Sequence, residues 1–596
     1  MSEGSNKGPL EGQGKPIAGA PTNAPGSTGT KPPPPPPGPA KPPPPKNPGF
    51  VTCTIDGKEV VAKPGTNMIE AARQVGSDIP YYCYHPRLSI AANCRMCLVE
   101  VSSSPKLVPA CQTAISEGLS VKTNSGVVKD SQRSVLEFIL LNHPVDCAIC
   151  DQAGECKLQD YYARYDFMPS RLEGSKILKN KRKVLGPLVV LDQERCILCT
   201  RCVRFMNEVA HEPQLGMFGR GSGERIDVFP GSELSSNYSG NTVDICPVGA
   251  LLNRDFRFRA RAWFLSEAPS VCTGCSRGCN VFVDFFGQET YRYRPRENEQ
   301  VNKSWMCDRG RLSYKYVNKD RVQTPQIGRS DDARETTGAE AVAFAARKLK
   351  AISHRPELAV MASPLASNED LLACLAFARD ALGARTVYVG GRPPGEGDHL
   401  LMTADKNPNR TGLTWIAAGL GLALRSFSDL IDALDAGAVK ALYVIGGEWP
   451  IEPVQPLAAF QRSELLVVQA INRGPLTELA DVLMPASTHV EDEGSFANLD
   501  GIIQRFRRAY PPLPESQPHW MWASRLAKEL GLTTAYSSPR DVFRQLSAGV
   551  KELSTFDWDK AAPPAQHVPG ISPAPAGADG RPPGHREWGV PRVRGI

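Results

Sequence analysis

Fifteen of the seventeen cysteines lie between Cys83 and Cys307, and all fifteen have the spacing of metal ligands. Thiolates two or three residues apart on a tight loop converge on one point, and such soft ligands select iron–sulfur clusters, zinc or Cu(I). Four such sites in one chain predict a row of redox centres. In chain order the sets are Cys83, Cys94, Cys97 and Cys111; Cys147, Cys150 and Cys156; Cys196, Cys199 and Cys202 with the distant Cys246; and Cys272, Cys275, Cys279 and Cys307.

Disulfides and structural zinc are the two other uses of such cysteines. A disulfide framework is typical of a short secreted chain, whereas this chain has 596 residues and cysteine pairs too close together to bridge. Zinc is the stronger alternative because C-x2-C knuckles serve it equally well. Zinc sites usually come as two separated knuckles, however, whereas Cys196, Cys199 and Cys202 place three thiolates on consecutive turns. That run, and the Pro247 that follows Cys246, resemble bacterial ferredoxins and favour iron–sulfur clusters.

The second set has three cysteines and therefore needs a fourth ligand from elsewhere. His143 lies four residues before Cys147, although a lone histidine in such a place is more often a bystander. Spacing alone leaves His143 and Cys246 exchangeable between the second and third sets. His85 follows Cys83 closely, and we expect it to be a surface or packing residue because four thiolates already close the first site.

Composition sets outer bounds on function. The net charge of +6 is small for this length and gives no case for binding nucleic acid or a membrane surface. The longest uncharged apolar stretch, Thr411–Leu424, contains three glycines and is too short to span a bilayer. We therefore expect no nucleic-acid partner and no membrane span in this chain. Reduced thiols in such number indicate a cytosolic or matrix compartment.

The first cysteine set follows a hairpin and a helix. Residues 51–55 and 58–62 are strand-like and are joined by Asp56-Gly57, which predicts a primed β-turn. Asn67 is placed to cap a helix with apolar positions at helical spacing. Hairpin, helix and cysteine loop are the order expected of a β-grasp ferredoxin domain.

The rest of the chain divides into regions that differ in composition and in the pattern of apolar residues. A proline-rich leader, expected to be disordered, covers 1–49, and a Pro/Gly-rich extended tail covers 546–596. Between them we expect a β-grasp ferredoxin domain over 50–128, a two-cluster α+β ferredoxin-like domain over 129–262 with a helix at Val135–Leu141, a third cluster domain over 263–322, and an α/β domain over 323–545. The α/β domain is predicted from strands at Leu358–Ala362, Thr386–Val389, Ala441–Ile445 and Leu465–Gln469 that alternate with helices at Asn368–Leu382 and Trp520–Leu530.

Two cysteines stand outside the ligand sets. Cys53 lies on the hairpin and Cys374 lies in a stretch with the pattern of an amphipathic helix, so both are predicted to be packing residues. The near match to a dinucleotide fingerprint, Gly419-Leu420-Gly421, lacks the third glycine and the downstream acid. We therefore expect no nicotinamide site here.

Three stretches resemble one family. YYCYHPRLSIAANCRMCLVEV over 81–101, with PACQT around Cys111, resembles the binuclear domain of respiratory complex I, and H-P-x-D-C-x2-C-x5-C from His143 matches another of its cluster motifs. The spacing of the last set resembles molybdopterin-dependent oxidoreductases, and the same pattern persists in many bacterial complexes I. From Val51 to about Leu532 the chain thus resembles the G-type large iron–sulfur subunit of NADH:quinone oxidoreductase.

The resemblance implies one 2Fe-2S cluster, three 4Fe-4S clusters and no molybdenum, with FMN and NADH on a partner subunit. It assigns the 2Fe-2S cluster to Cys83, Cys94, Cys97 and Cys111, and the 4Fe-4S clusters to His143, Cys147, Cys150 and Cys156; to Cys196, Cys199, Cys202 and Cys246; and to Cys272, Cys275, Cys279 and Cys307. It implies no catalytic residue, because outer-sphere electron transfer needs none. The α/β domain would share the molybdopterin-oxidoreductase fold, with a mostly parallel sheet, and serve as a scaffold.

By the same resemblance, the chain is an electron-transfer subunit of a proton-translocating NADH dehydrogenase in a respiratory chain. Single electrons would pass from the flavin subunit toward quinone, with the cluster of the last set off the main path. Its partners would be the flavin- and NADH-binding subunit and the quinone-side hydrophilic subunits, at the cytoplasmic face of a bacterial inner membrane. The alternatives are an electron-carrying or catalytic subunit of an NAD-linked formate dehydrogenase or hydrogenase, and a zinc-bearing assembly scaffold.

Overall fold

The computed structural model describes residues 49–165, 169–447, 455–534 and 536–559. The proline-rich leader, apart from its last residue, and the tail beyond 559 lie outside these described residues. None of the helices in the described part of the chain combines the length and the apolar character that a bilayer span requires.

The first region is a mixed sheet with one short helix. Its elements are β1 (Val51–Ile55), β2 (Lys58–Ala62), α1 (Met68–Gln74), β3 (Leu98–Val101), β4 (Ser104–Pro109) and β5 (Ser120–Lys122). The strands run in the order β2-β1-β5-β3-β4, with β1 antiparallel to β2 and parallel to β5. Both turn residues have positive φ, 49° at Asp56 and 80° at Gly57, as a primed turn requires. Asn67 caps α1 by accepting a hydrogen bond from the Glu70 N–H. The hairpin, its turn and the helix cap are all confirmed.

The second region is built from short elements. They are α2 (Gly126–Leu140), α3 (Lys157–Tyr165), α4 (Arg201–Glu208), α5 (Asn241–Asp244), β6 (Lys183–Val184), β7 (Val189–Leu191), β8 (Leu215–Phe218), β9 (Arg225–Val228) and β10 (Leu251–Asn253). Helix α2 begins well before the predicted Val135, because the Ser125 side chain accepts a hydrogen bond from the Val128 N–H and caps the helix there. Cys156 and Cys202 belong to the buried core of this region, so the candidate ligands are also part of its packing.

The third region is an antiparallel sheet in the order β11-β12-β13 followed by two short helices. The elements are β11 (Ser266–Val271), β12 (Asn280–Phe286), β13 (Glu289–Pro295), α6 (Asp308–Leu312) and α7 (Lys315–Asn318). Asp284 on β12 is buried and forms ion pairs with Arg292 and Arg294 on β13, at 2.6 and 2.7 Å. This buried carboxylate and its two half-buried arginines fix β13 against β12.

The fourth region is an α/β domain around an eight-stranded sheet in the order β15-β14-β21-β20-β19-β16-β17-β18. Its strands are β14 (Gln326–Ile327), β15 (Arg334–Glu335), β16 (Leu358–Ala362), β17 (Thr386–Val389), β18 (Ala423–Arg425), β19 (Ala441–Ile445), β20 (Leu465–Ala470) and β21 (Val482–Pro485). The pairs from β21 to β18 are all parallel, and β14 and β15 add an antiparallel edge. The predicted α/β class, its mostly parallel sheet and all four predicted strands are confirmed.

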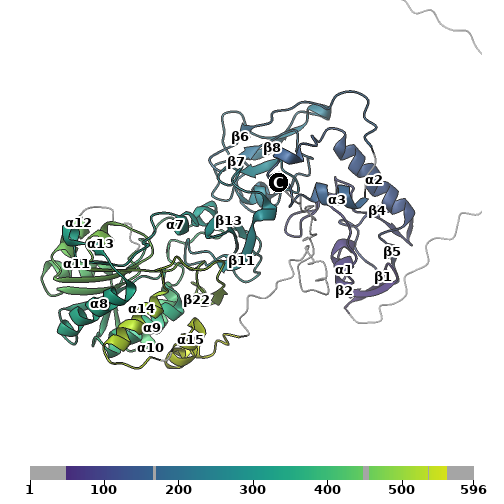
Figure 1. Cartoon of the computed structure of the whole chain (residues 1–596). Helices are drawn as coiled ribbons and strands as arrows, with labels where there is room; N and C mark the ends of the chain where they lie inside the picture. The colour runs from purple at the N-terminus through teal and green to yellow at the C-terminus, as the bar shows by residue number, and fades with distance from the viewer. Residues whose placement is uncertain (1–48, 166–168, 448–454, 535, 560–596) are drawn as a thin grey trace, which may run out of the picture. The chain divides into compact units, whose positions relative to one another are not determined.

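Helices cover both faces of this sheet (Figure 1). One face carries α8 (Gly338–Ile352), α9 (Asn368–Asp380), α10 (Arg410–Gly419), α14 (His519–Glu529) and α15 (Pro539–Leu546). The other face carries α11 (Phe427–Asp435), α12 (Gln455–Gln461) and α13 (Pro475–Glu478). Successive residues of one strand serve the two cores, with Val360 in the first and Met361 in the second. A small hairpin of β22 (Gly494–Ala497) and β23 (Ile503–Phe506) lies beside α9 and α10.

Two expectations for this domain need adjustment. Helix α9 is buried almost throughout rather than amphipathic, because α10, α14 and α15 pack around it; Cys374 within it is fully buried, as expected of a packing residue. The extended tail predicted from 546 is wrong for residues 546–559, because α16 (Lys551–Ser554) folds and Trp558 joins the core. Gly419 ends α10 and Gly421 follows with φ 69°, so the Gly-Leu-Gly segment is a helix terminus and not a strand-to-helix turn.

Candidate metal centres

The first site is a loop that brings its four cysteines together as two close pairs. The Cys83 N–H donates to Cys94 Sγ at 3.5 Å, and the Cys83 and Cys94 side chains are hydrogen-bonded to each other. Cys97 and Cys111 form the second hydrogen-bonded pair. The hydrogen bond from the Cys94 thiol outweighs burial and lowers the pKa of Cys83. The loop takes this path because Ala92 and Arg95, on either side of Cys94, have left-handed backbones with φ 50° and 57°.

At the second site, His143, Cys147, Cys150 and Cys156 line one cavity. His143 follows the end of α2 and Cys156 immediately precedes α3. The Asp146 carboxylate holds the connecting loop in place through a bidentate hydrogen bond from Arg195.

Two observations show that the second site has room for a metal-bound group. The Nδ1 atom of His143 is buried and has no hydrogen-bond partner among the described residues. Burial lowers the pKa of His143 to about 4, so the imidazole is neutral near pH 7 and able to bind a metal. Gly249 lies against the same cavity, and a Cβ there would come within 2.2 Å of Cys150 Sγ. The residues present therefore fit a cluster held by three thiolates and one imidazole.

At the third site, Cys196, Cys199, Cys202 and Cys246 line a small cavity. The loop that presents the first three is sharply turned, with positive φ at Leu198 (53°) and Thr200 (62°). Burial raises the pKa of the Cys196 thiol to about 12 and that of Cys199 to about 11. The spacing left His143 and Cys246 exchangeable; the fold places His143 at the second cavity and Cys246 at the third.

At the fourth site, Cys272, Cys275, Cys279 and Cys307 line a cavity together with two glycines. Cys272 ends the strand pair β11 and β12 by donating its N–H to the Cys279 carbonyl at 2.8 Å. Two backbone N–H groups point at sulfur, Gly274 to Cys272 at 3.4 Å and Gly310 to Cys307 at 3.3 Å. A Cβ at Gly310 would lie 3.0 Å from Cys272 Sγ, so glycine keeps this cradle open. N–H groups aimed at sulfur and a buried thiolate set are what an iron–sulfur cluster requires.

Among the described residues, no three His, Cys, Asp or Glu side chains are close enough together to hold a single metal ion. Each set instead encloses a loop or a cavity. Three of the donor sets contain four sulfurs each, and the remaining set contains three sulfurs and one imidazole nitrogen. Both compositions are ligand sets of polynuclear iron–sulfur clusters.

Sequence reasoning missed three residues that join the sites. The Arg204 guanidinium donates to the Cys83 carbonyl at 2.6 Å and to the Cys199 carbonyl at 3.3 Å, so one side chain links the first and third sites. Arg201 donates to the Tyr84 and Ile245 carbonyls, which adjoin Cys83 and Cys246. The signal was an arginine two residues after Cys199 and another two residues after Cys202.

Trp305, two residues before Cys307, is the third linking residue. Its indole stacks on His85 with centroids 5.3 Å apart and packs against Phe205 at 4.8 Å. His85 is therefore a half-buried packing residue, and its partial burial lowers its pKa to about 3. This aromatic cluster touches the segments that carry the first, third and fourth sites.

Five family models match the chain in the order of these regions. They describe a 2Fe-2S iron-sulfur cluster binding domain (50–126), an NADH-ubiquinone oxidoreductase-G iron-sulfur binding region (132–171), the ferredoxin-like domain of NADH-quinone oxidoreductase subunit 3 (186–252), a molybdopterin oxidoreductase Fe4S4 domain (265–319) and a molybdopterin oxidoreductase (402–529). The predicted succession of domain types is confirmed.

Curated relatives at about 40% identity are named as components of one kind of oxidoreductase. The G-type subunit of the NADH-quinone oxidoreductase from Rickettsia felis is 40% identical over 54% of this chain and 47% of the relative. The NADH-ubiquinone oxidoreductase 75 kDa subunit of Reclinomonas americana is 38% identical over 62% of this chain and 54% of the relative. An iron-sulfur protein of NADH dehydrogenase from Solanum tuberosum mitochondria is 40% identical over 56% and 45%. The chain thus matches about half the length of these relatives.

A solved structure of an NAD+-reducing NiFe-hydrogenase contains a chain that is 28% identical to this one, covering 35% of this chain and 90% of that chain. Its TM-score is 0.33, a similarity too low to bear on the fold. Four of the family models cover the segments that carry the four cysteine sets. The resemblance seen in the sequence is therefore confirmed: over about half of their length, this chain is similar to the G-type and 75 kDa subunits of NADH-quinone and NADH-ubiquinone oxidoreductases.

Proposed function

We propose that this chain is an electron-transfer subunit that carries one 2Fe-2S and three 4Fe-4S clusters. The observation that supports the proposal is that the candidate donors of the second, third and fourth sets line one cavity each, while those of the first set lie as two close pairs. When bound, the clusters accept and release single electrons. The proposed ligands are the sixteen residues that the motifs assign.

The two cluster types are proposed from the shapes of the sites. The first site holds its thiols as two close pairs, which suits two irons that each take two thiolates. The other sites enclose cavities lined by their four donors. Imidazole at the second site removes one negative charge relative to a fourth thiolate, and backbone N–H groups at the fourth site stabilise charge on sulfur.

The protein residues contribute spacing, burial and charge. Arg204 fixes the first site against the third through two carbonyls, and its positive charge favours the reduced state of both. Trp305, His85 and Phe205 fill the space beside the first, third and fourth sites with packed aromatic rings and exclude water there. Electron transfer needs no general acid, base or nucleophile, and we assign none.

The place of the chain in a complex follows from its relatives. We propose that FMN and NADH are bound by a partner subunit that feeds the 2Fe-2S cluster, and that quinone-side hydrophilic subunits receive the electrons. The fourth cluster is proposed to lie off this path. The assembly would sit at the cytoplasmic face of a bacterial inner membrane. The α/β domain is proposed to act without molybdenum; Cys374, its one cysteine, is buried and donates its thiol to the His519 carbonyl.

Metal analysis of the anaerobically purified chain tests the proposal. One binuclear and three tetranuclear clusters give about 14 iron atoms per chain, with neither zinc nor molybdenum. Redox titration followed by EPR should resolve four one-electron centres. Stoichiometric zinc without iron would refute the electron-transfer proposal, and stoichiometric molybdenum would refute the scaffold role of the α/β domain.

A further inference from the structure

Arg201 is a buried arginine whose charge has no carboxylate partner. The residue is 5% exposed and begins α4, directly before Cys202 in the loop of the third site. Its two terminal nitrogens donate to the backbone carbonyls of Ile245 and Tyr84. Among the described residues, no carboxylate lies within ion-pair distance of its guanidinium. Burying an unpaired charge is costly, so this arginine requires an anion nearby.

The remaining nitrogen of the same guanidinium has no partner either. The Nε atom of Arg201 is buried and has no hydrogen-bond acceptor among the described residues. Arg201 also lines the small cavity that the four cysteines of the third set line. Buried polar groups in folded proteins are nearly always satisfied, so the Nε–H requires an acceptor that the described residues do not supply.

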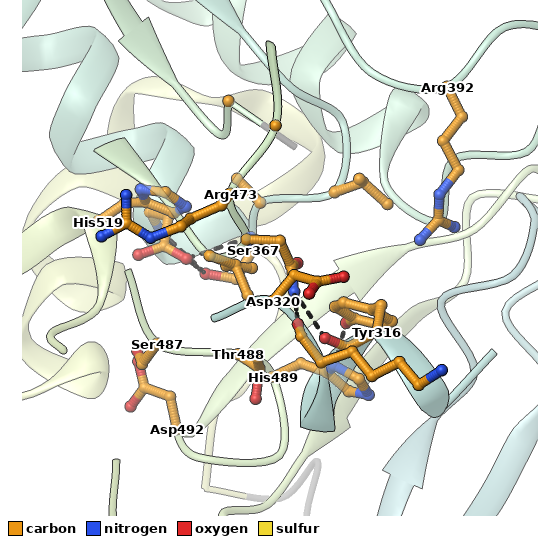
Figure 2. Close-up of a pocket in the computed structure, with 18 of the residues that line it drawn as sticks. Tyr316, Asp320, Ser367, Arg392, Arg473, Ser487, Thr488, His489, Asp492 and His519 are labelled. Carbon is orange, nitrogen blue, oxygen red and sulfur yellow. Dashed lines mark hydrogen bonds between the residues drawn. The ribbon is translucent and has the colours of Figure 1, made fainter. Parts of the chain in front are cut away.

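Two other arginines without a carboxylate partner are in a different situation. Arg392 and Arg473, labelled in Figure 2, line a cavity of about 420 Å³ in the α/β domain. Arg392 is half-buried and Arg473 is exposed, so solvent reaches their charge. The burial of Arg201 excludes this solution, and its place at a cysteine set indicates where the anion belongs.

The charges beside Arg201 are positive. The Cζ atom of Arg201 lies 5.8 Å from the centroid of the Tyr81 ring, and the Nζ atom of Lys157 lies 4.4 Å from the same centroid. A third cation, Arg73, lies 5.6 Å from it. One aromatic ring therefore faces three cations, which repel one another and add to the need for negative charge.

The carboxylates of the surrounding helices do not meet this need. They are Glu70 of α1, Asp78 shortly after it, Asp160 of α3, Glu208 of α4 and Asp244 of α5. Glu70 is paired with Arg73 at 2.6 Å, and Asp244 is hydrogen-bonded to Arg311 at 3.0 Å. The other three are exposed to solvent.

The cysteines of the third site already respond to the charge of Arg201. Burial raises the pKa of the Cys199 thiol to about 11, and the positive charge of Arg201 is the largest influence that opposes this rise. Burial also raises the pKa of Cys246, and Arg201 again acts in the opposite direction. The guanidinium thus lies where it favours thiolate, the form in which cysteine binds a cluster.

We propose that Arg201 is the counter-ion of the cluster at the third site, with its charge stabilising the reduced cluster and its Nε–H donating to a cluster sulfur. This inference rests on the proposed function, because the cluster itself is part of that proposal. Reduction adds negative charge, and both a cation and an N–H donor favour the more negative state. Arg201 therefore raises the reduction potential of the third cluster.

Redox titrations of the full chain, purified anaerobically with its clusters, test the proposal. Arg201→Gln removes the charge, and the potential of the third cluster should fall by about 59 mV or more, a tenfold change in its one-electron equilibrium. Arg201→Lys keeps the charge and should restore more than half of this difference. An unchanged potential in Arg201→Gln would overturn the proposal. So would an equal fall in both variants, because it would follow from lost packing and not from lost charge.

Pulsed EPR gives a second readout, which a purely structural role would not produce. In the chain labelled with ¹⁵N at arginine, the reduced third cluster should show a weak ¹⁵N coupling that Arg201→Lys abolishes. The absence of this coupling in the parent, or an undiminished coupling in Arg201→Lys, would overturn the proposal.

Iron content covers the case in which a variant does not retain the cluster. Loss of about four iron atoms in Arg201→Gln but not in Arg201→Lys would support the proposal, since the charge alone then decides whether the cluster binds. Loss in both variants would overturn it and leave Arg201 as a structural anchor.

Arg329→Gln is the control variant. Arg329 is paired with Asp481 at 2.6 Å in the α/β domain and lines none of the cysteine sites, so its loss should leave all four potentials unchanged. The two proposals fail separately. A parent chain without iron at the third site refutes the electron-transfer proposal, whereas full iron content with an unchanged potential in Arg201→Gln overturns this inference alone.

Discussion

Adding one methyl group at Gly249 should remove the second cluster and leave the other three in place. A Cβ at this residue would lie 2.2 Å from Cys150 Sγ and 3.1 Å from Gln152 Cβ, whereas ordinary contacts begin near 3.4 Å. The Cys150 sulfur must therefore move by about 1.2 Å, the difference between the first and last of these distances. That displacement is about half a metal–sulfur bond length of roughly 2.3 Å, which is too much for a ligand to remain bound.

Iron content and EPR spectra of Gly249→Ala measure this effect. We expect about 10 iron atoms per chain in place of about 14, with loss of one tetranuclear signal and retention of the binuclear one. Gly126→Ala is the matched control, because a Cβ there meets nothing within 4 Å and Gly126 begins α2, the helix that precedes His143. Full iron content with an unchanged spectrum in Gly249→Ala would refute the assignment of Cys150 to a cluster in this cavity.

Three further substitutions test the imidazole ligand, the arginine that links two sites and the ion pairs of Asp284. His143→Cys should keep the iron content and lower the potential of the second cluster, because a thiolate adds negative charge where a neutral imidazole stood; an unchanged potential in a redox titration would exclude His143 as a ligand. Arg204→Gln should lower the reduction potentials of the first and third clusters, because its guanidinium donates to the Cys83 and Cys199 carbonyls of those two sites. The potential of the fourth cluster should not change. Equal shifts at all clusters would argue against this local role. Asp284→Asn should lower the free energy of unfolding by about 2 kcal/mol in denaturant titrations, because Arg292 and Arg294 lose a buried charged acceptor and keep only Glu155 and Glu267 as counter-ions. Burial raises the pKa of Asp284, but those arginines outweigh it and hold the pKa low. The parent's extra stability should thus be present above about pH 4 and be lost as the pH falls through the lowered pKa, and the variant should lack this acid dependence.

Local chemistry made part of the fold predictable. The turn at Asp56-Gly57 needs positive φ at both residues, and Asn67 needs only its own helix to cap, so each signal is complete within a few residues. The strand at Leu358–Ala362 was predictable because a strand buried on both faces of a parallel sheet is a continuous apolar run. The amphipathic character predicted for helix α9 was wrong for a related reason. A helix that is packed on all sides needs no polar face, and a polar face is what marks an amphipathic helix.

Contacts between distant residues lay beyond the sequence. The spacing of the cysteines identified three candidate ligands for the second site, but it could not decide whether His143 or Cys246 is the fourth. That choice depends on how the fold places two residues that are about 100 positions apart in the chain. The approach of Gly249 to Cys150 is of the same kind.

The pKa values of the thiols link the clusters to the stability of the region around them. Burial raises the pKa of Cys196 and Cys199 far above neutral pH, and that of Cys202 further still, so without metal these thiols hold their protons. Iron–sulfur clusters bind thiolates, and forming them in such surroundings must release those protons and offset the cost of buried charge. The positive charge of Arg204, which donates to the Cys199 carbonyl, lowers this cost. Because Cys202 is also part of the hydrophobic core, the same cysteines that bind the clusters hold the short helices and strands together. In this region, cluster binding and folding are therefore one equilibrium.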